Sequence, residues 1–301
     1  MHHVLSCDQF SRTSLEQLFV LTDEMRVDGK KFSTSLAGKI VATIFYEPST
    51  RTRLSFEAAV SRLGGSIIST ENAKEMSSAI KGESLLDTIR VIDGYCDAIV
   101  LRHSDSTAAV DGASVSLVPI INAGSGSGEH PTQALLDAYT IYKYKNNIDG
   151  LSIAVLGDLR FGRTVHSLVK LLSLYDDITI YGLSRDVIAL PDEYVTYLSQ
   201  KGVSYIPCRS LADLPQDIDV LYHTRTQTER FKNTDLKIEE FIINQSVMKN
   251  FSAHTILMHP LPRRNEISFD LDDDKRSVFF QQSHFGMYVR MSLLHNILAG
   301  S

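Results

Sequence analysis

The chain has 301 residues, of which 43% are hydrophobic and 22% are charged, and its formal net charge is −6 at pH 7. At about 100–200 residues per domain, this length predicts two domains. The acidic balance argues against a nucleic-acid-binding protein, because such proteins are normally basic. Three scattered cysteines suit a reducing compartment. With no signal peptide or long apolar span evident, we expect a cytoplasmic protein that does not enter a membrane.

Short apolar runs alternate with segments of helical periodicity along the chain. The expected strands are residues 40–45, 66–69, 97–101, 118–122, 152–156, 178–181, 203–206, 218–222, 255–258 and 278–280. Helices are expected between most of them, with a long helix at 131–145 and a last helix at 286–299. This alternation predicts an α/β fold with parallel sheets flanked by helices. A domain boundary is expected within residues 131–150, where the long helix ends in a polar segment.

Polar and basic residues follow successive predicted strands at their carboxyl ends, where open parallel sheets bind ligands. They are Ser49–Arg53, Ser77 with Lys81, Arg102, His130 with Gln133, Arg163, Arg225 with Gln227, and the segment 259–262. In Ser49–Arg53, hydroxyls and two arginines stand between a strand and a helix, where free N–H groups and the helix dipole suit a phosphate. Together these segments predict a cationic cleft between two α/β domains.

Each segment also has a simpler interpretation. Serine and threonine often cap helices, His130 and Gln133 could do the same, and a loop lysine is usually solvated. His259 follows an apolar strand, so we expect a hydrogen-bonded structural histidine there rather than a base. Residues 157–164 approach a P-loop but have Arg163 at the lysine position, which argues against nucleotide binding. No spacing typical of a metal site or of a nucleophile motif is present, so no metal is expected.

The full set of segments resembles the aspartate/ornithine carbamoyltransferase family from one end of the chain to the other, and the aspartate branch in particular. The motifs that carry the resemblance are 49–53, 81–84, 102–103, 122–124, 130–137, 157–168, 224–227 and 259–263. Ornithine enzymes usually carry a cysteine where this chain has His259-Pro260-Leu261-Pro262, and they lack the stretch 163–168.

The resemblance implies a carbamoyl phosphate-binding domain at 1–134, to which residues 286–301 return, and an aspartate-binding domain at 135–285. It places the active site in the cleft between them. The implied reaction joins carbamoyl phosphate to L-aspartate, giving N-carbamoyl-L-aspartate and phosphate, in the pyrimidine pathway that leads to UMP. It uses no cofactor and no metal. An amine attacking a carbamoyl carbon needs aligned anions and a stabilised oxyanion, but no enzyme nucleophile.

The resemblance also implies residue roles. The carbamoyl phosphate ligands are Ser49, Thr50, Arg51, Thr52, Arg102, His130 and Gln133, with Ser77 and Lys81 donated by a neighbouring subunit. Within this set, Thr52, Arg102 and His130 are the catalytic donors to the carbamoyl oxygen. The aspartate ligands are Lys81, Arg163, Arg225 and Gln227, and the backbone carbonyls of Pro260 and Leu261 face the carbamoyl nitrogen.

Shared sites of this kind imply a homotrimer, and association with regulatory chains is left open. A cis Leu261–Pro262 bond is expected as well. Ile80, Ser125 and Asn265 differ from the residues that are common at these positions in the family. Two alternatives remain: a non-catalytic phosphometabolite-binding protein that kept the fold, and an ornithine enzyme. The second is disfavoured because ornithine has a cationic side chain and Arg163 and Arg225 would repel it.

Overall fold

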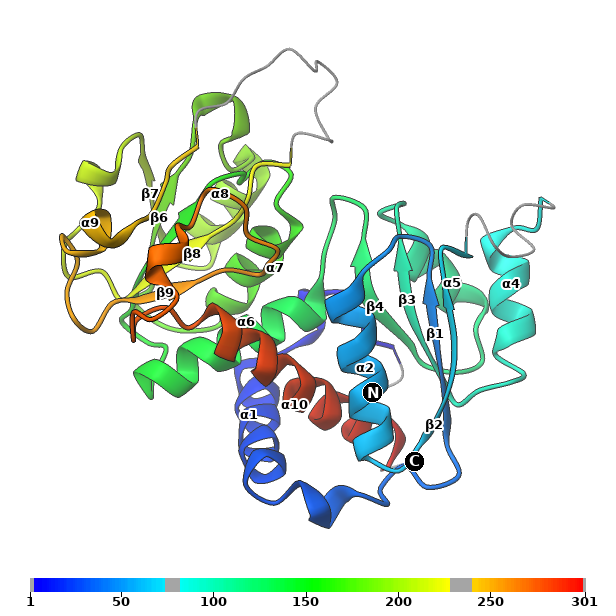
Figure 1. The fold of residues 1–301 in the computed structure, drawn as a ribbon. Coiled ribbons are helices and arrows are strands. Elements are labelled where there is room, and N and C mark those ends of the chain that lie inside the picture. The colour runs from blue at the N-terminus through cyan, green and yellow to red at the C-terminus, as the bar shows by residue number, and fades with distance from the viewer. Residues whose placement is uncertain (1–2, 74–81, 228–239, 300–301) are drawn as a thin grey trace. The chain divides into compact units, whose positions relative to one another are not determined.

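The computed structural model describes residues 3–73, 82–227 and 240–299. The chain divides into two compact units, which we call the first unit (1–136 with 284–301) and the second unit (137–283). Both boundaries fall inside long helices, α6 (Pro131–Lys145) and α10 (Phe279–Leu298). Each unit is built on its own parallel sheet (Figure 1), which confirms the predicted fold class.

The first unit contains a four-stranded sheet in the order β2-β1-β3-β4. Its elements before α6 are α1 (Arg12–Val27), β1 (Ile40–Phe45), α2 (Thr50–Arg62), β2 (Ser66–Glu71), α4 (Leu85–Ile92), β3 (Ala98–His103), α5 (Ala108–Val115) and β4 (Ile120–Ser125). Figure 1 shows α2 on one side of this sheet and α4 and α5 on the other. Strand β1 is apolar and largely β-branched, and five of its six residues are buried, as expected for a strand covered on both faces.

The second unit contains a five-stranded sheet in the order β7-β6-β5-β8-β9. Its elements between α6 and α10 are β5 (Ser152–Leu156), α7 (Arg163–Leu172), β6 (Thr179–Leu183), α8 (Asp192–Gln200), β7 (Ser204–Cys208), β8 (Val220–His223), α9 (Gln245–Met248) and β9 (Ile256–Met258). Helix α7 buries Val165, Leu168, Val169 and Leu172, the helical face that the sequence periodicity predicts. These side chains and the buried strand residues form the apolar interior of this unit.

Strand order reverses once in each sheet. From β1 the chain moves to one edge, β2, and then returns to β3 on the other side of β1; from β5 it moves outward to β6 and β7 and then returns to β8. Because parallel crossovers are right-handed, the helices that leave the two adjacent strands at a reversal cover opposite faces of the sheet. The carboxyl ends of β1 and β3, and of β5 and β8, are therefore the two places where such sheets bind ligands.

The expected strand at 278–280 is wrong. Ser277 forms only an isolated bridge to Leu257, Val278 N–H donates to Leu257 O at 2.9 Å, and α10 begins at Phe279. The last helix therefore starts seven residues earlier than the periodicity indicated. An apolar run of three residues cannot by itself distinguish a short strand from the first turn of a buried helix.

Among the described residues, no helix combines the length and apolar character needed to cross a bilayer.

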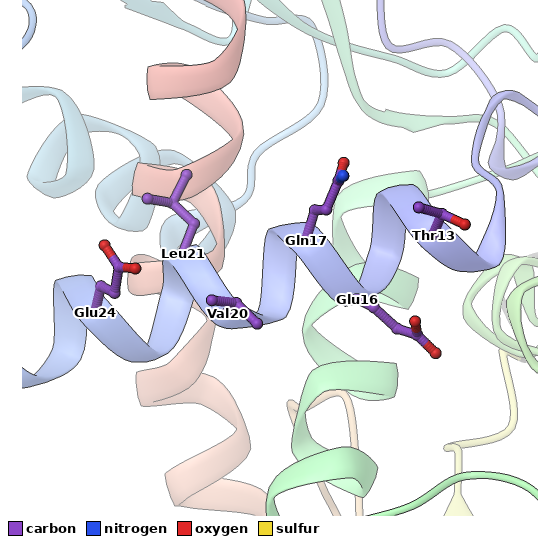
Figure 2. A pocket seen from close by; sticks show the side chains of 6 residues that line it. All are labelled: Thr13, Glu16, Gln17, Val20, Leu21 and Glu24. Atoms are coloured by element: carbon purple, nitrogen blue, oxygen red, sulfur yellow. The ribbon is translucent and has the colours of Figure 1, made fainter.

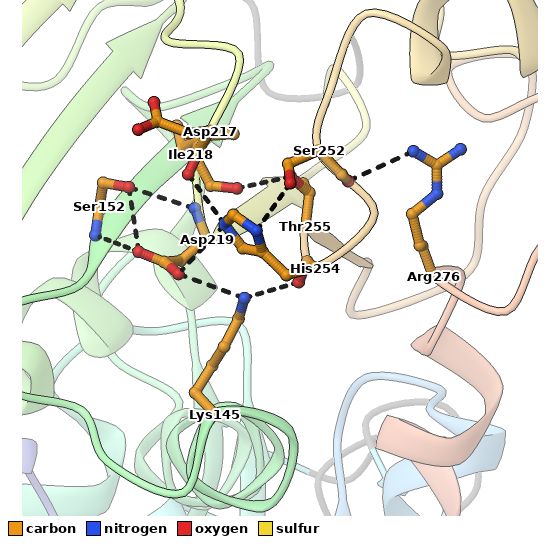
Figure 3. Close-up of polar contacts among 9 residues, drawn as sticks. All are labelled: Lys145, Ser152, Asp217, Ile218, Asp219, Ser252, His254, Thr255 and Arg276. Carbon is orange, nitrogen blue, oxygen red and sulfur yellow. Dashed lines mark hydrogen bonds and ion pairs between the residues drawn. The ribbon is translucent and has the colours of Figure 1, made fainter.

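At the amino-terminal edge of the second sheet, a polar network surrounds Asp219 (Figure 3). One carboxylate oxygen of Asp219 accepts from Ser152 N–H at 3.0 Å and from Ser152 Oγ at 3.1 Å, and the other lies 3.3 Å from Lys145 Nζ. Lys145 Nζ also donates to His254 O at 2.6 Å, and its side chain is only 8% exposed. Burial lowers the pKa of Lys145, while the Asp219 carboxylate raises it. Asp219 thus connects the end of α6 to the starts of β5 and β8.

We expect Asp219→Ala to lower the free energy of unfolding by about 2–3 kcal/mol, because Ser152 would lose the acceptor of its N–H and hydroxyl and the partly buried Lys145 would lose its counter-charge. Urea unfolding followed by circular dichroism measures this change. Asp217→Ala is the matched control, since it removes the same charge from an exposed carboxylate two residues away. Equal losses in both variants would contradict a role specific to Asp219.

Candidate active site

The first unit places the predicted phosphate-binding residues at the start of α2. Ser49 precedes the helix with φ −159° and ψ 84°, and its carbonyl accepts from Arg53 N–H at 3.0 Å. Thr50 and Arg51 are exposed, whereas Thr52 is 7% exposed. Although the Arg51 side chain reaches solvent, partial desolvation lowers the pKa of its guanidinium, which stays charged near neutral pH. Backbone N–H groups at this helix end and a cationic side chain beside them suit an oxyanion.

Arg53 differs from Arg51 although the sequence presents them as a pair. Its guanidinium lies 3.0 Å from Glu71 Oε2 and 3.5 Å from Glu57 Oε1, and it also donates to Ser69 Oγ at 3.2 Å. These contacts connect α2 to β2 and neutralise the charge within the unit. Arg53 therefore supports the loop, and Arg51 is the arginine of this segment left to face a ligand.

Arg102 stands at the end of β3, in register with Phe45 of β1. Its Nη2 lies 3.6 Å from Glu47 Oε2, and its Nη1 donates to the carbonyl of Ala123 on β4 at 3.2 Å. The side chain is 12% exposed. The guanidinium is thus held between the ends of β1 and β4, next to the residues that open α2. Glu47, which belongs to the same sequence stretch as Ser49–Arg53, is thus the carboxylate beside Arg102, a contact that the sequence did not predict.

His130 is buried and directly precedes α6. Its carbonyl accepts from the N–H groups of Gln133 at 3.0 Å and Ala134 at 3.2 Å, so the residue shapes the first turn. The preceding loop is tight, because a Cβ on Gly126 (φ +46°) would lie 2.7 Å from the carbonyl of Ser104. Ser125, one of the departures from the family pattern, is buried and donates to Asn122 Oδ1 at 2.9 Å. It helps to close this loop.

The second unit holds its predicted residues on the loops after β5 and β8, and Asp158 joins the two loops. Its carboxylate accepts from Phe161 N–H at 2.9 Å and from Gln227 N–H at 3.2 Å, while Gln227 Nε2 donates to Phe161 O at 3.0 Å. Gly157 is required here, since a Cβ would lie 2.1 Å from the carbonyl of Thr224. Arg163, 9% exposed, is the first residue of α7, and Arg225 lies on the neighbouring loop.

The loop after β9 contains Pro260 and Leu261, and the Leu261–Pro262 bond is cis, as predicted. His259 Nδ1 accepts from Leu261 N–H at 2.8 Å, so its proton is on Nε2, which donates to Glu266 Oε1 at 2.9 Å. Both Glu266 oxygens accept from Arg264 N–H at 3.1 Å. His259 is therefore a structural histidine, as expected, and Glu266 is a supporting residue that no sequence signal identified.

Three buried titratable groups lie close together beneath this loop. Burial lowers the pKa of His223 and of His259, whose rings are 6.3 Å apart between centroids. Although burial opposes it, hydrogen bonding from His259 and from the backbone lowers the pKa of Glu266. The cluster thus consists of neutral histidines and an ionised carboxylate near neutral pH.

The predicted residues fall into two groups, each at a reversal of strand order. Ser49, Thr50, Arg51, Thr52, Arg102, His130 and Gln133 gather at the carboxyl ends of β1, β3 and β4, which are neighbours in the first sheet. Arg163, Arg225, Gln227, Pro260 and Leu261 gather at the ends of β5, β8 and β9, which are neighbours in the second sheet. Ser77, Ile80 and Lys81 lie outside the described residues.

Two other features of the described part of the chain are separate from these groups. No cluster of three or more histidine, cysteine, aspartate or glutamate side chains there could hold a metal ion. A hollow of about 380 Å³ runs along one face of α1 (Figure 2), and no predicted site residue lines it. Its lining residues are Thr13, Glu16, Gln17, Val20, Leu21 and Glu24.

Two family models together cover nearly the whole chain. Residues 2–143 match the carbamoyl-P binding domain of aspartate/ornithine carbamoyltransferases, and residues 149–297 match the Asp/Orn binding domain. The chain therefore belongs to the aspartate/ornithine carbamoyltransferase family.

The proteins similar to this chain include several aspartate carbamoyltransferases. Aspartate carbamoyltransferase 3, chloroplastic, of Pisum sativum is 46% identical over 99% of this chain and 78% of its own length. The solved catalytic subunit of Methanocaldococcus jannaschii aspartate transcarbamoylase is 45% identical with a TM-score of 0.92, over 100% and 99% of the two chains. Trypanosoma cruzi aspartate transcarbamoylase, solved with carbamoyl phosphate and aspartate, is 38% identical with a TM-score of 0.93, over 99% and 97%.

The buried histidines predict a pH dependence of stability. Because the pKa values of His223 and His259 are lowered from 6.5 in the folded chain, the unfolded chain binds more protons below that pH. The free energy of unfolding should therefore fall on acidification from pH 6.5, by up to about 1.4 kcal/mol per pH unit for each histidine. Glu266 adds to this loss below pH 4.5, its ordinary pKa.

Urea unfolding at several pH values tests this dependence. His223→Gln removes one titrating group and keeps an amide donor for Phe241 O, so the slope of stability between about pH 6.5 and 5.5 should become shallower by up to one proton equivalent. A variant whose slope equals that of the parent chain would show that His223 is not one of the groups responsible.

Proposed function

We propose that this chain transfers the carbamoyl group of carbamoyl phosphate to the amine of L-aspartate, giving N-carbamoyl-L-aspartate and phosphate. The proposal rests on the distribution of two kinds of binding group, one in each unit. Hydroxyls, helix N–H groups and Arg51 occur in the first unit, and two arginines with an amide occur in the second. The first set suits a phosphate and the second suits a dicarboxylate. This step belongs to pyrimidine biosynthesis leading to UMP.

The phosphate is held by Ser49, Thr50, Arg51 and Thr52, and Arg102 contacts both phosphate and the carbamoyl oxygen. Thr52 and His130 donate to the same oxygen, and Gln133 orients the carbamoyl amide. Support comes from the geometry of the first unit, where the ends of three neighbouring strands carry these residues. Donors fixed in this way stabilise the negative charge that grows on the oxygen during attack, and removing one typically lowers turnover about 10²–10³-fold.

Aspartate is held by Arg163, Arg225 and Gln227, and the carbonyls of Pro260 and Leu261 accept from the carbamoyl nitrogen. As the amine attacks the carbamoyl carbon, a C–N bond forms and the bond from carbon to the phosphate oxygen breaks. The departing phosphate takes the amine proton, which balances the step without an enzyme base. Alignment of two anions and stabilisation of the oxyanion are then the tasks of the protein.

We further propose that the enzyme is a cytoplasmic homotrimer in which Ser77 and Lys81 of one subunit enter the site of its neighbour. The motif Lys81-Gly82-Glu83-Ser84 supports this arrangement. A regulatory chain is a further partner that the family admits.

The most direct test supplies carbamoyl phosphate with either aspartate or ornithine and follows phosphate release. We expect release with aspartate and none above background with ornithine. Phosphate release with ornithine alone would assign the chain to the other branch of the family. Binding of carbamoyl phosphate without release in either mixture would indicate a non-catalytic binding protein.

Arg225→Ala should raise the KM for aspartate roughly 10–100-fold, because one charge-assisted hydrogen bond to a carboxylate is lost. The KM for carbamoyl phosphate should change far less. Steady-state kinetics with each substrate varied in turn separate the two values. Arg209→Ala is the matched control, because this arginine lies in the same unit and its side chain is 85% exposed. Equal effects of Arg225→Ala on both substrates would contradict its assignment to aspartate.

Shared sites predict complementation between inactive variants. Lys81→Ala and Arg102→Ala should each be nearly inactive alone. Unfolded together and refolded, they should regain activity, because some sites would combine an intact Lys81 from one chain with an intact Arg102 from another. Phosphate release before and after mixing measures the gain. A mixture as inactive as its components would rule out sites shared between subunits.

A further inference from the structure

A buried chain of hydrogen bonds in the second unit centres on Asp137 of α6. One carboxylate oxygen accepts from the Tyr222 hydroxyl at 2.7 Å, and the other accepts from Gln282 Nε2 at 2.6 Å. All three side chains are at most 1% exposed. None of them belongs to the residues to which the proposed function gives a role, and burying a carboxylate is unfavourable unless its partners are well arranged.

The first branch of this chain runs to the loop that contains Pro260 and Leu261. Gln282 Oε1 accepts from His259 N–H at 2.9 Å, which fixes the orientation of the Gln282 amide, because a backbone N–H can only donate. His259 Nδ1 in turn accepts from Leu261 N–H at 2.8 Å. Asp137 accepts from the other end of the same amide and so helps to hold Gln282 in place, and through Gln282 and His259 it supports the backbone of Leu261.

The second branch runs to the start of α7. The Tyr222 hydroxyl donates to Asp137 at 2.7 Å; burial raises the pKa of Tyr222, and the side chain of Thr164 acts in the opposite direction. Thr164 directly follows Arg163, the first residue of α7. A single buried carboxylate thus connects two separate segments of the second unit, the loop after β9 and the amino-terminal end of α7.

We propose that Asp137 is a positioning residue for the carbamoyl transfer, acting through Gln282 on the carbonyls of Pro260 and Leu261 and through Tyr222 and Thr164 on Arg163. The inference rests on the proposed function. The first branch positions the carbonyls of Pro260 and Leu261, which contact the carbamoyl nitrogen during the reaction. Loss of this branch should therefore reduce kcat. The second branch governs a residue that binds aspartate, so its loss should raise the KM for aspartate.

Two variants separate the branches. Gln282→Met keeps the side-chain volume and removes the two side-chain hydrogen bonds that Gln282 makes; we expect kcat to fall about 10–100-fold with little change in the KM for aspartate. Tyr222→Phe removes the hydroxyl of the second branch; we expect the KM for aspartate to rise about 5–10-fold with little change in kcat. Ser292→Ala is the control, since it removes another buried hydrogen bond, from Thr22 at 2.9 Å, outside both branches.

Backbone hydrogen exchange provides a readout that does not need activity. Exchange at the His259 and Leu261 amides should accelerate at least about tenfold in Gln282→Met and stay unchanged in Ser292→Ala, because only the first variant removes the acceptor of His259 N–H. If the parent chain releases no phosphate, the proposed function fails, and the exchange data still decide whether the first branch holds the loop. Equal stability losses in all three variants, with kinetics and exchange unchanged, would overturn the positioning role.

Gln282→Glu tests the same contact if Gln282→Met does not fold. This variant is isosteric, and its new carboxylate would lie against that of Asp137, so the two must share a proton. We expect protection of Leu261 N–H and kcat to decrease together as the pH rises through the pKa of this pair, with no such decrease in the parent chain. A pH profile identical to that of the parent would contradict the proposed contact.

Discussion

The constraint on which the rest of the structure depends is the direction of the strands. Apolar strands such as β1 and β5 are buried on both faces, and such strands pair in parallel through helical crossovers. All strands of one sheet then end at the same edge. Where the strand order reverses, the following helices depart to opposite faces and leave the strand ends uncovered. Loops at these places can carry charged side chains at little loss of core packing.

In the proposed reaction, the residues that contact substrate are held in place by other polar residues, which themselves make no contact with substrate. Asp158 joins the loops of Arg163 and Gln227, Glu266 and His259 hold the loop of Leu261, and Glu47 lies beside Arg102. A buried carboxylate tolerates few arrangements of its donors, because each unsatisfied donor is costly away from water. These carboxylates give the loops one shape, and a fixed shape is what electrostatic stabilisation of an oxyanion needs.

Sequence patterns located most of the fold. The strand at 40–45 and the helix at 131–145 have the predicted bounds, and most other strands begin within two residues of prediction. The error at 278–280 arose because a three-residue apolar run is compatible with a short strand and with the first turn of a helix. In the structure Ser277 and Val278 contact the backbone of Leu257, and α10 begins at the next residue, Phe279. The pairing of Arg53 with Glu71 was also invisible in the sequence, since the two residues are distant along the chain; only the pair Arg53 and Glu57 has the i,i+4 spacing of a helical ion pair.

The sequence by itself determined the class of fold, the segments that carry binding residues and the family, because periodicity and spaced motifs are local properties of the chain. Only the tertiary structure decided which charges are neutralised and which buried groups hold each loop. Asp137, Tyr222 and Gln282 are separated by 85 and 60 positions along the chain, and no local pattern links them. The three side chains come from α6, β8 and α10, and the packing of these elements brings them together at a buried position away from water.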